Sequence, residues 1–332
     1  MENTFKAYIV EEKDGEFVAA VKAKSLSDLP QGEVLIKVQY SSLNYKDALS
    51  ASGNKGVTKN YPHTPGIDAV GLVISSESES FKANDKVIVT SYDLGMNTAG
   101  GFGQFIRVPA AWVIPLPENL SMKEAMILGT AGLTAGMSVL KLIQQVKPKD
   151  GPIAVSGATG GVGALSVAIL KKLGYNVTAI TGKESEKDYL TSLGAENVLL
   201  RKDIESFDNK PLLKPLFAGG IDTVGGVILQ NLIKTTSPLG AITCCGNVAS
   251  PKLELTVFPF ILRGISLIGI DSQNFPMADR IEVWNKLAND WKPEHLDHSC
   301  TEIGLSELSD KIQLMLQGQL KGRTVLNLNK EE

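Results

Sequence analysis

The chain has little cysteine and little net charge. Only Cys244, Cys245 and Cys300 occur among its 332 residues, and so few cysteines exclude a disulfide framework and favour a reducing compartment. A net charge of −3 gives no electrostatic reason to expect nucleic acid or an acidic membrane as a partner. The first residues lack the cationic start and apolar stretch of a signal peptide, and no other run reads as a membrane span. We therefore expect a cytoplasmic protein.

The first third of the chain is rich in strand patterns. Residues 33–45 alternate apolar and polar side chains, and apolar runs follow at residues 69–76 and 85–92, so each segment predicts a strand. Residues 121–146 have apolar side chains at helical spacing, and Ser121 with Glu124 matches a helix capping box. Because 43% of the 332 residues are hydrophobic, the chain can fill the cores of two domains.

From Pro152 onward, strand and helix patterns alternate. Strands are expected at residues 152–157, 175–182, 197–200, 221–226, 240–247 and 265–272. Such alternation predicts a doubly wound parallel sheet with helices on both faces. We therefore predict an α/β protein in which a β-rich domain, residues 1–124 and 272–332, receives an inserted cofactor domain, residues 125–271. The helical tail should pack on the β-rich domain.

The sequence SGATGGVG, residues 156–163, joins a strand pattern to a helix pattern. In the dinucleotide-binding fingerprint G-x-G-x-x-G, the first glycine makes the turn, the second admits the pyrophosphate and the third lets the helix approach the sheet. When the second and third glycines of the fingerprint are aligned with Gly160 and Gly163, its first glycine falls on Ala158, and Gly157 lies one residue earlier. The strict pattern is therefore broken, and an ordinary tight turn would also favour glycine. The strand before, the helix after and the second strand beyond indicate a dinucleotide site.

The end of the second strand indicates which dinucleotide binds. NAD enzymes usually place Asp or Glu there to hold the ribose hydroxyls. Here Thr181, Gly182 and Lys183 occupy this place, and a hydroxyl with an ammonium suits a 2′-phosphate. Glu184 is close enough to keep NAD as an alternative, and a solvated loop lysine is the simpler explanation of Lys183. We expect NADP, bound as NADPH.

Six segments together resemble one family. They are SSLNYKDAL (41–49), PGIDAVG (65–71), GTAGLTA (129–135), SGATGGVG, IDTVGG (221–226) and PFILRGISLIGIDS (259–272). They resemble the medium-chain dehydrogenase/reductase superfamily, and most of all the acryloyl-CoA reductase (YhdH/YhfP-type) group of its zinc-free quinone oxidoreductase branch. The resemblance covers nearly the whole chain. It implies a GroES-like catalytic domain together with a Rossmann domain that binds NADP.

The resemblance also implies that no metal is bound. Zinc-dependent relatives carry a cysteine and a Gly-His-Glu segment, whereas Asn44 and Gly66-Ile67-Asp68 stand there in this chain, and no Cys-x-x-Cys cluster occurs. His295, His298 and Cys300 form a loose ligand-like group, which we interpret as surface. Without a Lewis acid, alcohol oxidation is disfavoured. Reduction of an activated C=C bond needs only a hydride donor, an oriented acceptor and a proton.

The candidate catalytic residues are Tyr45, Asn44 and Asp68. Tyr45 would contact the nicotinamide ribose or supply a proton, unless it is a packing residue. Asn44 and Asp47 would orient it, although Asp47 could equally cap the next helix. Alternatively, the role of Asp68 is only to hold a neighbouring Arg or Lys. Arg263 could bind a phosphate or stabilise a loop. The resemblance assigns cofactor binding to Tyr45, Thr159, Gly160, Gly161, Val162, Thr181, Gly182, Lys183, Arg201, Asn247, Ile261, Ser272 and Arg323.

The function implied by the resemblance is NADPH-dependent reduction of α,β-unsaturated acyl thioesters such as acryloyl-CoA. Two alternatives stay open, a reductase of quinones or small enones and a non-catalytic NADPH-binding sensor or scaffold. Residues 256–270 are apolar and β-prone, and we expect them to form the last strand of the cofactor domain. Its open edge favours a homodimer. The expected partners are therefore a small-molecule substrate and a second copy of the chain, without nucleic acid or membrane.

Overall fold

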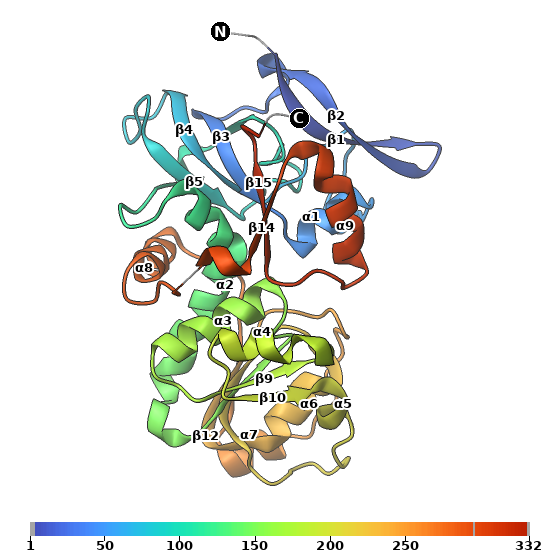
Figure 1. Ribbon diagram of the computed structural model, residues 1–332, viewed down its shortest axis with the longest axis vertical. Coiled ribbons are helices and arrows are strands. Elements are labelled where there is room, and N and C mark those ends of the chain that lie inside the picture. Colours follow the sequence, from blue (N-terminus) through green and yellow to red (C-terminus); the bar gives the residue numbers. More distant parts are fainter. Residues whose placement is uncertain (1–3, 295, 331–332) are drawn as a thin grey trace. The chain divides into compact units, whose positions relative to one another are not determined.

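The structure of the protein, a computed structural model, describes residues 4–294 and 296–330, without the side chain of residue 298. The chain forms two compact units (Figure 1). Unit 1 comprises Met1–Thr130, Gln273–Ala288 and His295–Glu332, and unit 2 comprises Ala131–Ser272 and Asn289–Glu294. The first boundary thus differs from the expected residue 124, and Asn289–Glu294 joins unit 2, which the sequence pattern did not indicate. His295 and the side chain of His298 lie outside the described residues.

Unit 1 is built on a seven-stranded sheet in the order β14-β15-β3-β4-β5-β7, with β6 paired to β3. β14 and β15 are parallel, whereas the other neighbours are antiparallel, and β1 and β2 form a separate antiparallel hairpin. The strands expected at residues 33–45, 69–76 and 85–92 are confirmed as β3, β4 and β5. The bounds are β1 Thr4–Lys13, β2 Glu16–Ser25, β3 Val34–Ser42, α1 Tyr45–Ala51, β4 Asp68–Ser76, β5 Lys86–Thr90, β6 Phe105–Val108, β7 Val113–Pro115, α8 Met277–Ala288, β14 Cys300–Ile303, α9 Leu308–Leu316 and β15 Arg323–Asn327.

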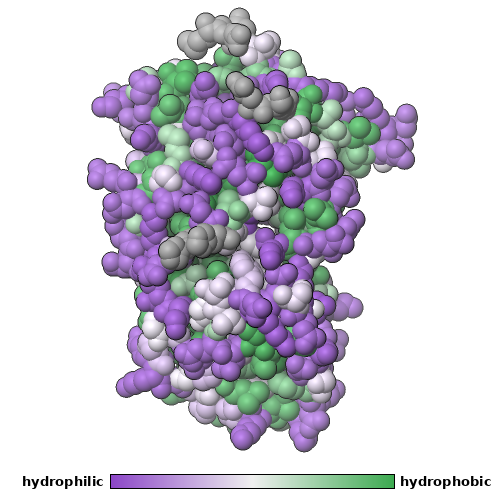
Figure 2. Space-filling model, in the orientation of Figure 1, coloured by the Kyte–Doolittle hydropathy of each residue, from purple (hydrophilic) through white to green (hydrophobic). Residues whose placement is uncertain are grey.

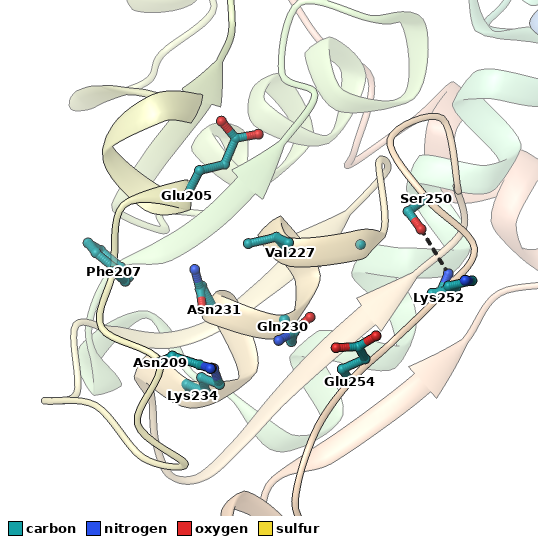
Figure 3. A pocket seen from close by; sticks show the side chains of 11 residues that line it. Glu205, Phe207, Asn209, Val227, Gln230, Asn231, Lys234, Ser250, Lys252 and Glu254 are labelled. Carbon is teal, nitrogen blue, oxygen red and sulfur yellow. Dashed lines mark hydrogen bonds between the residues drawn. The ribbon is translucent and has the colours of Figure 1, made fainter.

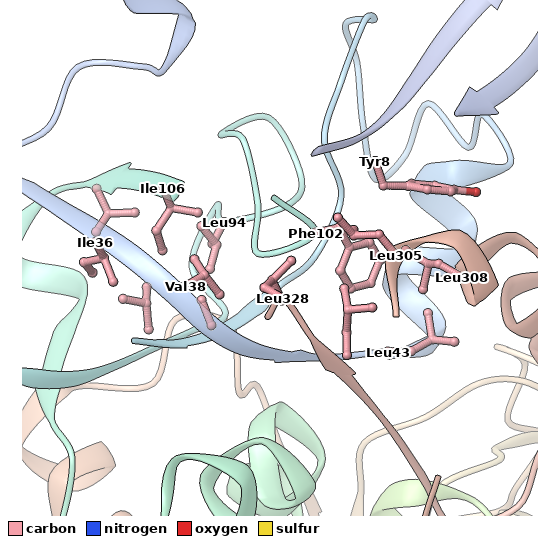
Figure 4. Close-up of a cluster of buried hydrophobic side chains, with 14 of the residues drawn as sticks. Tyr8, Ile36, Val38, Leu43, Leu94, Phe102, Ile106, Leu305, Leu308 and Leu328 are labelled. Carbon is pink, nitrogen blue, oxygen red and sulfur yellow. The ribbon is translucent and has the colours of Figure 1, made fainter. Parts of the chain in front are cut away.

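The hydrophobic core of unit 1 joins the two ends of the chain. Ile36 and Val38 of β3 point into it because alternate residues of a strand share a face, and Leu305, Leu308 and Leu328 of the tail are buried in the same cluster (Figure 4). The helical tail therefore packs on the β-rich domain, as its sequence predicts.

Helix α2, Met122–Gln145, begins with the predicted capping box and bends near its start. The Ser121 N–H donates to Glu124 Oε2 at 2.8 Å, and the Glu124 N–H donates to Ser121 Oγ at 3.2 Å. By length and composition alone α2 is able to cross a membrane, which corrects the expectation that no run has that length and composition. However, 78% of its apolar window is buried inside the protein. Such burial is typical of the core helix of a globular protein.

Unit 2 contains a six-stranded parallel sheet in the order β10-β9-β8-β11-β12-β13. The first strand, β8, lies between β9 and β11, so the strand order reverses there, as in the Rossmann fold. This confirms the predicted doubly wound sheet. The bounds are β8 Ile153–Ser156, α3 Gly161–Lys172, β9 Val177–Thr181, α4 Lys187–Ser192, β10 Asn197–Leu200, α5 Arg201–Glu205, β11 Phe217–Asp222, α6 Gly226–Thr235, β12 Thr236–Cys244, α7 Phe258–Arg263 and β13 Ser266–Gly269.

The segment 256–270 is only partly a strand. Residues 266–269 form the edge strand β13, as expected, but residues 258–263 form helix α7. Pro259 lies in the first turn of this helix, where its missing N–H costs nothing, whereas the same residue would interrupt a sheet ladder. Exposed apolar side chains gather on and beside α7, and Figure 2 shows hydrophobic surface where Figure 1 labels this helix. This apolar patch consists of Leu239, Val257, Phe258, Ile261 and Leu262.

We expect the edge of β13 and the apolar patch to be covered by a second copy of the chain, since both favour burial. Leu262→Asp, at a side chain that is 64% exposed, should shift the protein from dimer to monomer at micromolar concentration in sedimentation velocity. Val227→Asp is the matched control, because Val227 is an exposed apolar residue of α6 in the same unit, and it should leave the dimer intact. A wild-type monomer would contradict this expectation.

Candidate functional site

The glycine loop of unit 2 connects β8 to α3. Gly157 has φ 58°, and a Cβ built on it would lie 2.3 Å from Thr223 Oγ1, so only glycine fits this turn. Gly157 therefore supplies the turn that the fingerprint assigns to its first glycine, one residue before Ala158. α3 begins after Gly160, which has no side chain to accept hydrogen bonds from the first N–H groups of the helix. Those groups, including Gly161 and Val162, suit an anion such as a pyrophosphate.

The residues expected at the adenosine phosphate also lie together. The Arg201 guanidinium lies 3.2 Å from the position that a Cβ would take on Gly182, which places it beside the loop that carries Lys183. Thr181 Oγ1 accepts a hydrogen bond from the Lys183 N–H at 3.0 Å, so this buried hydroxyl shapes the loop. Glu184, the residue that favours NAD, forms an ion pair with Lys187 at 3.0 Å. The Arg201 guanidinium, which also lies 3.7 Å from Glu205 Oε1, is thus next to the end of β9, where a 2′-phosphate is expected to bind.

The residues expected on the nicotinamide side are more scattered. Ile261 is 67% exposed on α7 and belongs to the apolar patch, which explains it without a cofactor. Asn247 is exposed in the loop that follows β12. Arg263 donates to the backbone oxygens of Lys234, Thr236 and Leu213, so the structure supports its alternative role as a residue that stabilises a loop. The cofactor contacts of Asn247, Ile261 and Ser272 stay predictions.

In unit 1, Asn44 and Asp47 fix the start of α1. Asp47 Oδ2 accepts from the Asn44 N–H at 2.8 Å, and its Oδ1 accepts from the N–H groups of Gly66 at 3.1 Å and Ile67 at 2.8 Å. The capping role weighed for Asp47 is therefore confirmed. Tyr45 is the first residue of α1, and its side chain is 42% exposed, so it is not a buried packing residue.

Asp68 joins this helix start to distant parts of unit 1. Its carboxylate is fully buried and accepts from Ser42 Oγ at 2.6 Å, from Asn44 Nδ2 at 2.8 Å and from Thr130 Oγ1 at 2.6 Å. It also accepts from the Thr130 N–H, at 2.9 Å and 3.0 Å from its two oxygens. Asn44 and Asp68, two of the three positions compared with zinc ligands, thus contact each other directly. These partners are consistent with a positioning role for Asp68 and Asn44, and the catalytic role expected for them stays a prediction.

Arg323 completes this network from β15. Its guanidinium donates to Ile127 O at 2.8 Å, Ser42 Oγ at 2.9 Å and Asn44 Oδ1 at 3.3 Å, and Nη2 lies 3.9 Å from Asp68 Oδ2. The prediction that Asp68 holds a neighbouring arginine is confirmed. The guanidinium is buried and donates to these groups, and the contact of Arg323 with the nicotinamide stays a prediction.

Gly129 lets α2 pass this network. It has φ 50° and ψ −152° within the helix, and a Cβ there would lie 2.5 Å from Asp68 Oδ2 and 2.6 Å from Ser42 Oγ. Sequence reasoning included Gly129 in a family segment but missed its function and that of Thr130. The available signal was the glycine inside a helical pattern, which usually has a packing reason.

Metal-binding groups and reactive thiols are not apparent in the described parts of either unit. Ile67 is buried and cannot ligate a metal, and residues 4–294 and 296–330 contain no cluster of three or more His, Cys, Asp or Glu side chains suited to one. The cysteines are free. Burial raises the pKa of Cys244 and Cys300, and it raises the pKa of Cys245 to about 12, so the thiols stay protonated at neutral pH.

A hollow of about 390 Å³ lies along α6 in unit 2 (Figure 3). Lys234 is buried near the end of α6, and its ammonium donates to Asn209 Oδ1 at 3.4 Å. None of the lining residues belongs to the glycine loop or to residues 181–183, so the hollow is separate from the predicted cofactor residues. It is lined by Glu205, Phe207, Asn209, Gly226, Val227, Gln230, Asn231, Lys234, Ser250, Lys252 and Glu254.

Comparison with known proteins gives matches over nearly the whole chain. The alcohol dehydrogenase GroES-like domain matches residues 30–118, and the zinc-binding dehydrogenase family matches residues 161–289. The chain is 42% identical over 330 residues to YhfP of Bacillus subtilis, named as a quinone oxidoreductase, covering 99% of this chain and 100% of YhfP. It is 41% identical over 328 residues to the acrylyl-CoA reductase AcuI of Ruegeria pomeroyi, covering 98% and 99%.

Solved structures agree with these matches. The yhdH oxidoreductase of Salmonella enterica in complex with NADP has a TM-score of 0.95 and 40% identity, covering 98% of this chain and 100% of that one. Bacillus subtilis yhfP with NAD bound also has a TM-score of 0.95, with 42% identity, covering 98% and 99%. The predicted pair of a GroES-like domain and a Rossmann domain is confirmed.

The buried carboxyl group of Asp47 makes the stability of unit 1 sensitive to pH. Burial and the like charge of Asp68 raise its pKa from 3.8 to about 7. Between these values the native state holds a proton that the unfolded chain has released, so this group makes the free energy of unfolding fall as the pH rises. Asp47→Asn removes this titration, and losing the acceptor for the Asn44 N–H should cost about 1–3 kcal/mol.

Urea denaturation from about pH 4.5 to about pH 8 tests this, since the window spans the raised pKa. The stability advantage of the wild type over Asp47→Asn should shrink as the pH rises. Asp85→Asn is the control, because Asp85 accepts from the Lys82 N–H in a turn near the surface, and its difference from the wild type should stay constant. If the stability advantage of the wild type over Asp47→Asn grew as the pH rose, the raised pKa of Asp47 would be contradicted.

Proposed function

The chain belongs to the medium-chain dehydrogenase/reductase superfamily, in its quinone oxidoreductase-like branch, and on this premise we propose that it uses NADPH to reduce the C=C bond of an α,β-unsaturated acyl thioester such as acryloyl-CoA. The observation that carries the proposal is the 41% identity to an acrylyl-CoA reductase over 98% of the chain. The same comparisons identify the chain as an oxidoreductase, so the non-catalytic sensor or scaffold is set aside.

The residues of unit 2 fit the proposed cofactor. The N–H groups of Gly161 and Val162 bind the pyrophosphate at the start of α3, and Lys183 with Arg201 binds the 2′-phosphate. When bound, the nicotinamide supplies the hydride for the β-carbon of the substrate. The cations beside Gly182, together with the engagement of Glu184 by Lys187, support NADPH over NADH.

The residues of unit 1 support a reaction without zinc. Although the second family match is described as zinc-binding, Asn44 and Asp68 here bond to each other and to Ser42, Thr130 and Arg323. The carboxylate network holds the start of α1, whose first residue is the exposed Tyr45. We propose that Tyr45 orients the nicotinamide ribose and that water protonates the α-carbon.

A second candidate function is reduction of quinones or small enones, favoured by the 42% identity to YhfP, which is named as a quinone oxidoreductase. The substrate chemistry differs in one respect. An acyl thioester carries a CoA group that extends far beyond the reacting bond, whereas a small quinone or enone does not. Direct comparison of these acceptors separates the two functions.

The proposed activity is tested by following NADPH oxidation at 340 nm with acryloyl-CoA, small enones and quinones as acceptors. We expect kcat/KM for acryloyl-CoA to exceed that for each other acceptor by at least roughly tenfold, equivalent to about 1.4 kcal/mol of differential transition-state binding. Exhaustive chelation should leave the rate unchanged. A higher kcat/KM for quinones would support the second candidate, and loss of activity on chelation with recovery on adding zinc would overturn the zinc-free mechanism.

Lys183→Ala tests the cofactor preference. The change should weaken NADPH binding by about 1–2 kcal/mol, the size of a partly exposed charge-assisted contact, and should leave NADH binding nearly unchanged. Titration of both cofactors by fluorescence gives the two dissociation constants. Lys172→Ala, at an exposed lysine of the same unit, is the control and should change neither. Equal losses for both cofactors would show that Lys183 does not contact the 2′-phosphate.

Tyr45→Phe tests the source of the proton. If Tyr45 only positions the cofactor, the variant should bind NADPH more weakly and lower the single-turnover rate by less than about tenfold, since general acid catalysis usually contributes a hundredfold or more. Tyr40→Phe on β3 is the control and should behave as the wild type. A fall of roughly a hundredfold at saturating NADPH, with unchanged cofactor affinity, would make Tyr45 the proton donor.

A further inference from the structure

Asp222 places a buried carboxylate at the end of β11, the strand next to β8 at the point where the strand order reverses. Its side chain is fully buried. Oδ1 accepts from Ser156 Oγ at 2.7 Å, and Oδ2 accepts from the Gly225 N–H at 2.7 Å. One carboxylate therefore joins the last residue of β8 to the start of α6.

Ser156 passes this constraint to the glycine loop. Its hydroxyl donates to Asp222 and accepts from the Thr223 N–H at 3.0 Å, while its carbonyl oxygen accepts from Thr223 Oγ1 at 2.9 Å. Gly157, the next residue, has the left-handed φ that makes the turn and packs against the same threonine. The backbone where β8 enters the turn is thus held by hydrogen bonds that begin at Asp222.

The free-energy cost of burying the Asp222 carboxylate indicates that this residue has a function. Burial raises the pKa of Asp222, and the carboxylate forms no ion pair within the described residues. The titratable groups that face it are the thiols of Cys244 and Cys245, which are protonated. A buried charge without a cation is expensive, and a neutral residue could fill the same space at lower cost.

We propose that Asp222 is a positioning residue for the nicotinamide cofactor, which acts through Ser156 and Thr223 to hold the glycine loop in the shape that receives the pyrophosphate. The proposal rests on the assignment of this loop as the cofactor loop in the function proposed above. Asp222 itself does not touch the cofactor. It lies in the segment IDTVGG, whose chemistry the sequence analysis left unassigned.

Asp222→Asn has two expected effects on cofactor affinity, and they have opposite signs, which makes the variant informative. Removing a negative charge near an anionic pyrophosphate would strengthen cofactor binding. Losing the acceptor for the Ser156 hydroxyl would disturb the glycine loop and weaken binding, and this is the outcome that positioning requires. Because the effect concerns the pyrophosphate, it should be the same for NADPH and NADH, unlike the effect of Lys183→Ala.

The experiment measures the dissociation constants of NADPH and NADH for the full chain, for Asp222→Asn, for Ser156→Ala and for the double variant. Each single change should raise both constants about tenfold, the effect of losing one or two buried hydrogen bonds. The double variant should lose no more than the weaker-binding single variant, since the two residues act as one unit. Asp150→Asn, which removes an exposed acceptor of the Lys147 N–H in the same unit, should leave both constants within about twofold.

Thermal unfolding without cofactor separates positioning from a purely structural role. The proposal would be overturned if the single variants bound the cofactors more tightly than the wild type. It would also be overturned if their dissociation constants were unchanged while the unfolding midpoint fell, or if the losses of affinity multiplied in the double variant. If Asp222→Asn does not fold, Ser156→Ala and Thr223→Val give the same readout. If the variants bind the cofactors more weakly but the wild type reduces no acyl thioester, the positioning role holds and the proposed substrate is wrong. If the wild type binds neither NADPH nor NADH, both proposals are wrong.

Discussion

Burial of the Asp68 carboxylate is the constraint on which unit 1 depends. A carboxylate without solvent requires hydrogen-bond donors around it. Here they come from Ser42 at the end of β3, Asn44 before α1, Thr130 after the bend of α2 and, less closely, Arg323 of β15. These segments are distant in sequence, so folding unit 1 and assembling the network are one event. The course of α2 is part of it, because Gly129 alone allows the helix to pass so close to these polar atoms.

The network also suits the zinc-free reaction proposed above. A metal ion cross-links its ligands and fixes their orientation, and here Asn44 and Asp68 are cross-linked by a direct hydrogen bond of 2.8 Å. In the proposed reaction this hydrogen bond holds the two residues in place without supplying a Lewis acid. What remains suits a reaction in which the acceptor already carries an electron-withdrawing carbonyl group.

The sequence predicted the regular parts of this structure well, because strand alternation, the Ser121–Glu124 capping box and the glycine loop are all local signals. It failed where distant residues decide the outcome. The contacts of Arg323 with Asn44 and Asp68 could not be seen in its sequence neighbourhood, and neither could the link from Asp222 to Ser156. Residues 258–263 have β-prone side chains, but Pro259 favours the helix that the structure shows.

The state of the cysteines acquires a meaning from the proposed substrate. An α,β-unsaturated thioester is an electrophile that alkylates thiolates at its β-carbon, so an enzyme that handles it is exposed to inactivation by its own substrate. Only the thiolate form of a cysteine reacts readily, and burial raises the pKa of Cys244, Cys245 and Cys300 alike. The raised pKa values thus disfavour alkylation of these thiols by the compound that the chain is proposed to consume.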